Sequence, residues 1–250
     1  MNLDKCAQFA DELILTHWYQ PIYNLNNKKV IGFEALVRNK EAADIAPLYI
    51  FEKARLEGYL NTLDSHLVLH AVNSFKYHSD TALFLNVFPS TLLEKWFLPW
   101  WDKHIGVNPQ IVLEITESEP ITDWKAFKEI ITELKQRKTK IALDDMGSGY
   151  SFFKNWIELN PNYIKLDRYY SIDLAKNALK QKLLASLIKL FGSATVTILE
   201  GIETANDLEA AKQLGIPCAQ GYLLGRPAPL DNLGGINNFV KLNANSLLNC

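Results

Sequence analysis

The stretch Ile141-Ala-Leu-Asp-Asp-Met-Gly-Ser-Gly-Tyr150 ends an apolar run in two carboxylates and a glycine-flanked turn. The apolar run predicts a buried strand. Two adjacent aspartates at its exit repel each other and lose hydration, so they need a cation or several donors to neutralise them. Gly147 and Gly149 can bend the backbone and let a ligand approach it. The stretch therefore has two interpretations: a metal site, or a helix N-terminus capped by Asp145 or Ser148.

The composition is that of an ordinary globular protein, with 48% hydrophobic and 22% charged residues in a chain of 250. No linker rich in proline, serine or glycine divides the chain, so we expect a single domain. The formal net charge of -2 disfavours binding to polymeric nucleic acid, because no global basic field is present.

The cysteines, the first fifteen residues and the length of the apolar stretches indicate in which compartment we expect the protein. Cys6, Cys218 and Cys250 fit neither a disulfide framework nor a C-x-x-C metal knuckle. Charged residues interrupt the first fifteen positions, so we do not expect this stretch to be the h-region of a secretory leader. No apolar stretch approaches the roughly 20 residues that a membrane span needs. We therefore expect a cytoplasmic protein without a membrane segment.

Strand and helix patterns alternate along the chain, with apolar runs of the length that a mostly parallel sheet needs. The first two strands, over residues 18–25 and 30–36, predict a β-hairpin around Asn26-Asn27. Toward the C-terminus we expect one long helix over residues 174–191 and a last strand over residues 218–223. With about eight strands, a (β/α)₈ barrel fits this length better than an open sheet.

Polar side chains stand at the ends of the predicted strands. In a barrel these ends meet at one rim, where barrel enzymes carry their chemistry. The residues are Glu34, Asn86, Glu114, Asp144, Asp145, Lys165, Glu200 and Gln220.

Carboxylates gathered at one rim destabilise each other, since two unit charges about 4 Å apart cost roughly 4 kcal/mol at an effective dielectric near 20. Divalent cations would offset this repulsion, and an all-oxygen set suits Mg²⁺ or Mn²⁺ better than zinc. The adjacent Asp144 and Asp145 favour two ions, the usual arrangement for phosphate-ester displacement. Arg38 and Lys165 are then candidate partners for phosphate and water.

Two other features each have a functional and a structural interpretation. His66 and His70 lie one helical turn apart and could form a metal pair, but they lack the acidic partner of an H-E-x-x-H motif, which favours packing. The aromatic segment Trp96–Trp101 could be a partner surface, although packing under a loop is the more frequent role of such a cluster.

Several motifs, in order, together resemble the EAL-domain family of cyclic di-GMP phosphodiesterases. The resemblance runs from about residue 20 to residue 229. The motifs are Glu34-Ala-Leu36 with Arg38, Leu113-Glu-Ile-Thr-Glu117, Asp144-Asp-Met-Gly-Ser-Gly-Tyr-Ser151, Lys165-Leu-Asp167, Glu200-Gly-Ile-Glu-Thr204 and Gln220-Gly-Tyr222.

The resemblance implies a modified (β/α)₈ TIM barrel whose first strand is antiparallel to the others. It implies hydrolysis of cyclic di-GMP to linear pGpG by a metal-activated water, with two Mg²⁺ or Mn²⁺ ions, in a homodimer. By motif, Glu34, Asn86, Glu114 and Asp144 would hold one metal and Asp145 the second.

The remaining roles are also carried over by motif. Glu200 would be the base or a second-metal ligand, and Lys165 would hold the attacking water. Glu203 and Gln220 would bind waters at the metals, and Glu117 would brace the loop 146–150, which the family links to a dimer contact. The dinucleotide would be contacted by Gln20, Leu36 and Arg38.

The sequence departs from the family pattern at Met146, Ser148, Phe88 and Leu199, none of which is a ligand position. These departures bear on loop stiffness and rate more than on metal binding. Two alternatives to an active phosphodiesterase remain: an inactive EAL module that binds cyclic di-GMP as a receptor, and another metal-dependent barrel enzyme. Because all the acidic motif residues and Lys165 are present, the sequence favours the enzyme.

Overall fold

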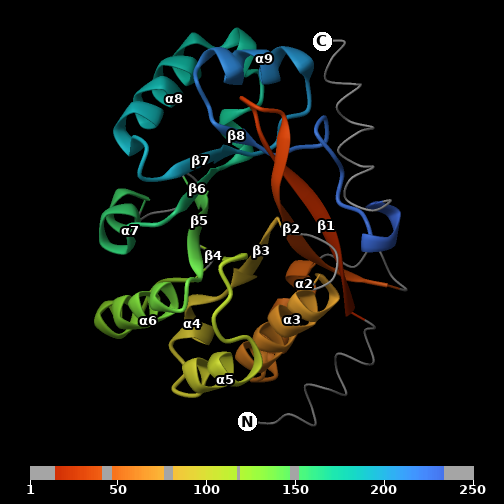
Figure 1. Cartoon of the computed structure of the whole chain (residues 1–250), viewed down its shortest axis with the longest axis vertical. Helices are drawn as coiled ribbons and strands as arrows, with labels where there is room; N and C mark the ends of the chain where they lie inside the picture. Colours follow the sequence, from red (N-terminus) through yellow and green to blue (C-terminus); the bar gives the residue numbers. More distant parts are fainter. Residues whose placement is uncertain (1–14, 41–46, 76–80, 117–118, 147–151, 234–250) are drawn as a thin grey trace.

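The structure is a computed structural model that describes residues 15–40, 47–75, 81–116, 119–146 and 152–233. Eight strands close into a barrel in chain order, from β1 to β8 (Figure 1). The first strand runs antiparallel to both of its neighbours, β2 and β8, and all other neighbouring pairs are parallel. The predicted barrel with an antiparallel first strand is therefore confirmed.

The strands are short except for the opening hairpin. They are β1 (Leu15–Asn24), β2 (Lys29–Asn39), β3 (Ala82–Val87), β4 (Ile111–Ile115), β5 (Lys140–Met146), β6 (Tyr163–Leu166), β7 (Val196–Leu199) and β8 (Cys218–Ala219).

Helices connect the parallel strands and cover the outside of the barrel (Figure 1). The α-helices are α2 (Pro47–Leu56), α3 (Leu60–Phe75), α4 (Pro89–Leu92), α5 (Phe97–His104), α6 (Trp124–Gln136), α7 (Phe152–Leu159), α8 (Ala178–Phe191) and α9 (Ala205–Gln213). The 3₁₀ turns are η1 (Arg168–Tyr170), η2 (Leu174–Lys176) and η3 (Leu230–Leu233).

The barrel interior has an apolar layer below a polar one, because successive strand residues face opposite sides of the sheet. The apolar layer is Ile22, Phe84, Val112, Ala142, Ile198 and Cys218. Two residues further along the parallel strands come Asn86, Glu114, Asp144, Glu200 and Gln220. Gly32 leaves room for this layer, since a Cβ there would lie 2.6 Å from the Phe84 ring.

Two predicted elements near the C-terminus are wrong in extent. The expected helix over 174–191 is divided: η2 ends at Lys176, and extended Asn177 starts α8 by accepting a hydrogen bond from the Lys180 N–H. The expected strand over 218–223 stops at Ala219, because Gly221 begins a turn in which its carbonyl accepts from the Leu224 and Gly225 N–H groups.

The aromatic segment Trp96–Trp101 packs against the barrel. Phe97 and Trp101 are fully buried, and the Trp101 indole donates to the Gly106 carbonyl at 3.0 Å. Trp96 and Trp100 are partly buried against the same core. The packing interpretation of this segment is the one that the structure supports.

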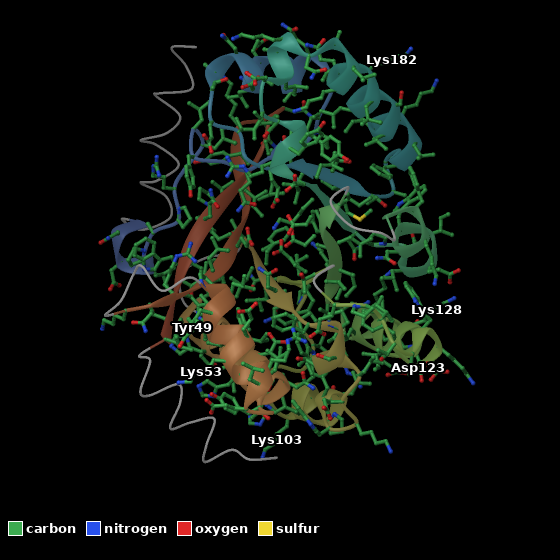
Figure 2. The ribbon with its side chains drawn as sticks, turned by 180° about the vertical axis from the view of Figure 1, so that it is seen from behind. Tyr49, Lys53, Lys103, Asp123, Lys128 and Lys182 are labelled. Atoms are coloured by element: carbon green, nitrogen blue, oxygen red, sulfur yellow. The ribbon has the colours of Figure 1, made fainter. Side chains whose placement is uncertain are left out.

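Lysines project outward from the helices, as Figure 2 shows for Lys103, Lys128 and Lys182. These helices are amphipathic and bury their apolar sides against the strands. In the part of the chain that the structure describes, no helix combines the length and the apolar character needed to cross a membrane.

Candidate active site

A cavity of about 310 Å³ opens at the carboxyl ends of the parallel strands. Its lining is mostly charged and comes from β1, β2, β5 and β6 and from the segments that follow β6, β7 and β8. The lining residues are Gln20, Glu34, Leu36, Asp144, Asp145, Lys165, Asp167, Arg168, Glu200, Gly201, Glu203, Gln220, Gly221 and Tyr222.

Lys165 lies at the floor of this cavity and is buried. Its Nζ is 2.9 Å from Glu114 Oε1, Asp144 Oδ1 and Glu200 Oε1. A fourth carboxylate oxygen, Glu34 Oε2, is 3.2 Å away. Burial alone would lower the pKa of Lys165, but the four carboxylates raise it well above its ordinary value, so the group carries a positive charge.

Amide side chains fix the orientation of Glu34. Asn86 Nδ2 donates to Glu34 Oε1 at 3.1 Å, and Gln220 Nε2 donates to Glu34 Oε2 at 2.7 Å. Gln220 Nε2 also donates to Gln20 Oε1 at 3.0 Å. Because Asn86 uses its nitrogen for Glu34, its side-chain oxygen is left to act as an acceptor or ligand.

The two adjacent aspartates lie at an irregularity in β5. The pairing register of β5 with β6 shifts between Leu143 and Met146, and Asp145 has a φ of 51°, in the left-handed region. An ordinary strand would send neighbouring side chains to opposite faces, but here both carboxylates line the cavity. Met146, the next residue, is buried in the main core.

The pKa values of the carboxyl groups in the cavity are shifted in different directions. Burial raises the pKa of Glu114 well above its ordinary value and that of Glu200 to about 8. Burial together with Asp144 raises the pKa of Asp145 to about 6. Burial also acts to raise the pKa of Glu34, but Lys165, Gln220 and Asn86 hold it below its ordinary value.

The donor set fits divalent cations. Two groups of carboxylate oxygens each lie within 4.8 Å of one another, Glu34 with Glu114 and Asp144, and Asp144 with Asp145 and Glu200. Asp144 belongs to both groups, as expected for two neighbouring ions. Within the described residues, the buried Glu114 Oε2 has no hydrogen-bond donor or ion pair. A cation would satisfy this oxygen and keep the raised-pKa carboxyls ionised.

The structure brings most of the predicted site residues together. Glu34, Asp144, Asp145, Lys165, Glu200, Glu203, Gln20, Leu36 and Gln220 line the cavity. Asn86 and Glu114 contact the lining side chains through the bonds given above.

The structure does not place the two remaining predicted site residues, Arg38 and Glu117, in the cavity. Arg38 is not among the lining residues: its Nη1 donates to the Val37 carbonyl, and its guanidinium lies 5.7 Å from the centre of the Trp18 ring. Glu117 and the loop 147–151 lie outside the described residues.

Besides two glycines, sequence reasoning assigned no role to three lining residues: Asp167, Arg168 and Tyr222. Asp167 and Tyr222 end two of the motifs, close to Lys165 and Gln220, and this proximity was the available signal. Arg168 reaches Glu203 Oε1 at 3.5 Å, and Gly201 permits this arrangement, since a Cβ at 201 would lie 2.4 Å from Arg168 Cβ.

Of the two candidate metal-binding histidines, His66 and His70, His70 packs against β1. His70 on α3 stacks on His17 of β1, and their Nδ1 atoms are 3.0 Å apart. Among the described residues, no cluster of three metal-ligating groups includes His66 or His70. The packing interpretation therefore describes His70 better than a metal pair does.

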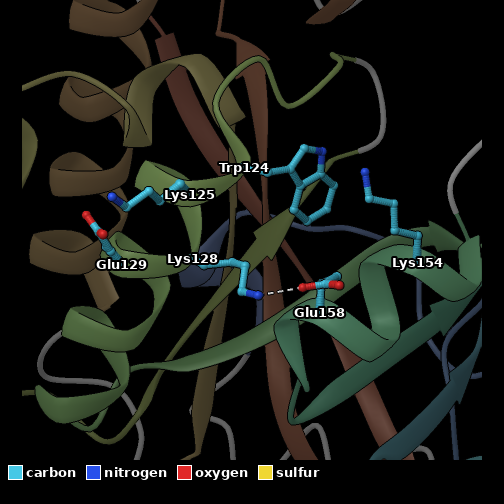
Figure 3. A pocket seen from close by; sticks show the side chains of 6 residues that line it. All are labelled: Trp124, Lys125, Lys128, Glu129, Lys154 and Glu158. Atoms are coloured by element: carbon cyan, nitrogen blue, oxygen red, sulfur yellow. Dashed lines mark hydrogen bonds and ion pairs between the residues drawn. The ribbon is translucent and has the colours of Figure 1, made fainter.

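A second hollow, of about 520 Å³, lies between α6 and α7 (Figure 3). Trp124 forms its apolar part, with Lys154 Nζ 4.3 Å from the centre of the indole ring. Lys128 Nζ pairs with Glu158 Oε2 at 2.5 Å across the two helices. None of the strand-end carboxylates lines this hollow, so it is separate from the barrel mouth.

The fold and the strand-end residues together define a (β/α)₈ barrel with an acidic, all-oxygen centre. The model of the EAL domain matches residues 10–227. The chain belongs to the EAL domain family.

Individual relatives agree with this assignment. The chain is 30% identical over 248 residues to "Probable cyclic di-GMP phosphodiesterase PdeI" of Escherichia coli K12, covering 94% of this chain and 31% of that protein. Klebsiella pneumoniae BlrP1, solved as a complex with manganese and cyclic di-GMP, is 26% identical with a TM-score of 0.77, covering 86% of this chain and 56% of that one.

A third relative matches over its full length. The PaMucR phosphodiesterase, solved with cyclic di-GMP, is 25% identical with a TM-score of 0.78, covering 93% of this chain and 100% of that one. By contrast, this chain spans less than half the length of the curated relatives that it matches first.

Proposed function

We propose that this chain is a phosphodiesterase that hydrolyses one phosphodiester bond of cyclic di-GMP to give linear pGpG. The observation that carries the proposal is the ring of carboxylates around Lys165, in which Asp144 belongs to two candidate metal groups. Relatives named cyclic di-GMP phosphodiesterases, and relatives solved with this ligand, give the substrate class.

The proposed cofactors are two Mg²⁺ or Mn²⁺ ions. Glu34, Asn86, Glu114 and Asp144 would hold one ion, and Asp145 would hold the other with Asp144 and Glu200. Such ions supply positive charge that stabilises the attacking oxygen and the phosphate of an in-line displacement. A relative solved with manganese and cyclic di-GMP supports this choice.

The side chains around the ions would act on protons and on orientation. Glu200 is the proposed acceptor of the proton from the attacking water or, alternatively, a ligand of the second ion, because its carboxylate lines the cavity close to Asp144 and Asp145. Lys165 donates hydrogen bonds that hold Glu200 and, in this proposal, the attacking water. Glu203 and Gln220 would position further waters in the cavity, which they line.

Substrate contacts are proposed for the rim. Gln20 and Leu36 line the cavity, and Arg38 would reach it by leaving the Trp18 ring. Glu117 is proposed to brace the loop 147–150. That all 250 residues form a single domain, that the protein is a homodimer and that it is cytoplasmic stay predictions.

Incubation of the purified protein with cyclic di-GMP and either Mg²⁺ or Mn²⁺ tests the proposal. We expect pGpG to accumulate with metal and none to form after chelation. Binding of cyclic di-GMP without pGpG under either metal would instead identify a receptor. Turnover of another phosphate ester without binding of cyclic di-GMP would identify a different metal-dependent barrel enzyme.

A further inference from the structure

The turn that follows β8 is rigidly attached to the rim of the cavity. The Ile202 N–H donates to the Gln220 carbonyl at 3.1 Å, and the Leu223 N–H donates to the Ile202 carbonyl at 3.0 Å. From the other side, Gln20 Nε2 donates to the Gly225 carbonyl at 3.0 Å. Tyr222 lies between these anchors, so its backbone position is fixed by contacts to β1 and to the loop after β7.

Tyr222 is a large aromatic side chain left open to solvent at a polar cavity. It lines the cavity and is 49% exposed. The Arg226 guanidinium lies 4.2 Å from the centre of its ring, which is close contact for a cation–π pair. Among the described residues, no carboxylate forms an ion pair with Arg226, which is itself exposed. The pair thus offers an aromatic ring and a guanidinium that no acidic side chain of the described residues neutralises.

The cationic side chains that line the cavity are already close to carboxylates, which makes Arg226 important for binding an anion. The carboxylates of Glu34, Asp144 and Glu200 already share the Lys165 ammonium. The other lining cation, Arg168, is 3.5 Å from Glu203. Besides the ions and Arg38 proposed above, an anionic ligand therefore finds positive charge at Arg226, beside the exposed ring of Tyr222.

We propose that Tyr222 and Arg226 form a base-binding shelf, on which one purine of the cyclic dinucleotide stacks while its phosphodiester lies over the ions that the carboxylates would hold. This inference rests on the function proposed above. The Arg226 guanidinium covers one face of the Tyr222 ring, and a ring whose other face is open can stack any nucleobase. The shelf thus contributes to affinity through the ring, while Arg226 holds the ring in place and adds a positive charge that attracts the anionic ligand.

Steady-state kinetics with cyclic di-GMP and Mn²⁺ test the shelf. Tyr222→Leu should raise KM about ten-fold and leave kcat within about two-fold, because base stacking contributes to binding and is made equally before and in the transition state. Tyr222→Phe keeps the ring and should restore the KM of the unchanged protein. Arg226→Gln should also raise KM, by a smaller factor.

Tyr169→Leu is the matched control. Tyr169 is 63% exposed and has Lys180 Nζ 4.2 Å from its ring centre, the same kind of pair, but it does not line the cavity. Its substitution should leave KM for cyclic di-GMP unchanged. An equal rise of KM in Tyr169→Leu and Tyr222→Leu would overturn the shelf, because the effect would then be a general one on stability.

The outcomes separate the shelf from the proposed activity. Turnover with an unchanged KM in Tyr222→Leu rejects the shelf and leaves the phosphodiesterase intact. If the unchanged protein forms no pGpG, the proposed activity fails, and equilibrium binding of cyclic di-GMP then decides the shelf. In that case a weaker affinity of Tyr222→Leu supports the shelf, whereas equal affinities or no binding by the unchanged protein reject it.

Discussion

The ammonium group of Lys165 contacts four carboxylates in the barrel mouth. At the scale of single residues, this contact decides the charge state of the site. Removing one charge from a buried cluster leaves the opposite charges uncompensated, which costs far more than losing a surface pair. The carboxylates must then bind protons or cations, and their raised pKa values already indicate that tendency.

Lys165→Met should lower the free energy of unfolding of the metal-free protein by about 3–5 kcal/mol at pH 8. The loss should be smaller at pH 5, where protonation removes the repulsion between Glu114, Glu200 and their neighbours. Urea unfolding at pH 8 and at pH 5 measures both losses of unfolding free energy. Lys128→Met is the control: its partner Glu158 is exposed, so its loss should stay below about 1 kcal/mol at both pH values. Equal losses in the two variants would contradict the role given to Lys165.

Glu200→Gln should bind cyclic di-GMP with nearly the affinity of the unchanged protein and lose turnover. The substitution keeps the shape of the side chain and removes the proposed proton acceptor, which lowers kcat by about 10²–10⁴-fold. Calorimetric binding and pGpG formation measure the two effects separately. Unchanged turnover in this variant would show that another group is the base.

At the scale of elements, α3 is joined to the connection between β3 and α4 by one buried carboxylate. Asp64 Oδ2 accepts a hydrogen bond from the Phe88 N–H at 3.0 Å, two residues after Asn86. Burial raises the pKa of Asp64 to about 7, against an ordinary value of 3.8. Between these values the folded protein holds a proton that the unfolded chain has released. Asp64 therefore makes the protein less stable as pH rises from about 4 to about 7.

Asp64→Asn keeps an acceptor for the Phe88 N–H and removes the titration. The variant should gain free energy of unfolding relative to the unchanged protein as pH rises from 5 to 8, measured by urea unfolding. The pKa of Asp102 is shifted in the opposite direction from that of Asp64, because the hydrogen bond with Arg137 lowers it. Asp102→Asn should therefore show no such relative gain. A constant difference between Asp64→Asn and the unchanged protein would argue against the raised pKa.

At the scale of the whole molecule, metal binding and folding are coupled, because the candidate ligands come together only when the barrel closes. An ion at 100 times its Kd should add about 2.7 kcal/mol to the free energy of unfolding. Asp144→Asn should need a higher Mn²⁺ concentration for the same gain, since Asp144 belongs to both candidate groups. The control Asp102→Asn, which alters a surface pair with Arg137, should follow the unchanged protein. Superimposable Mn²⁺ titrations of Asp144→Asn and the unchanged protein would remove Asp144 from the ligand set.

Much of this arrangement follows from local patterns in the sequence. Apolar runs that end in Asp144, Glu200 or Gln220 predict strands with polar ends, since side chains alternate along a strand. The order of the motifs predicts the barrel and the family, both of which are confirmed. The sequence by itself therefore determined the type and order of the elements and the residues at the strand ends.

Only the tertiary structure decided how these groups meet. The four contacts of Lys165, the position of Arg38 beside Trp18 and the pairing of Arg226 with Tyr222 depend on barrel closure and side-chain conformation. The division of the predicted helix at Asn177 likewise depends on a cap within the folded chain. Distances between residues far apart in sequence are set by the closed sheet, which no local pattern encodes.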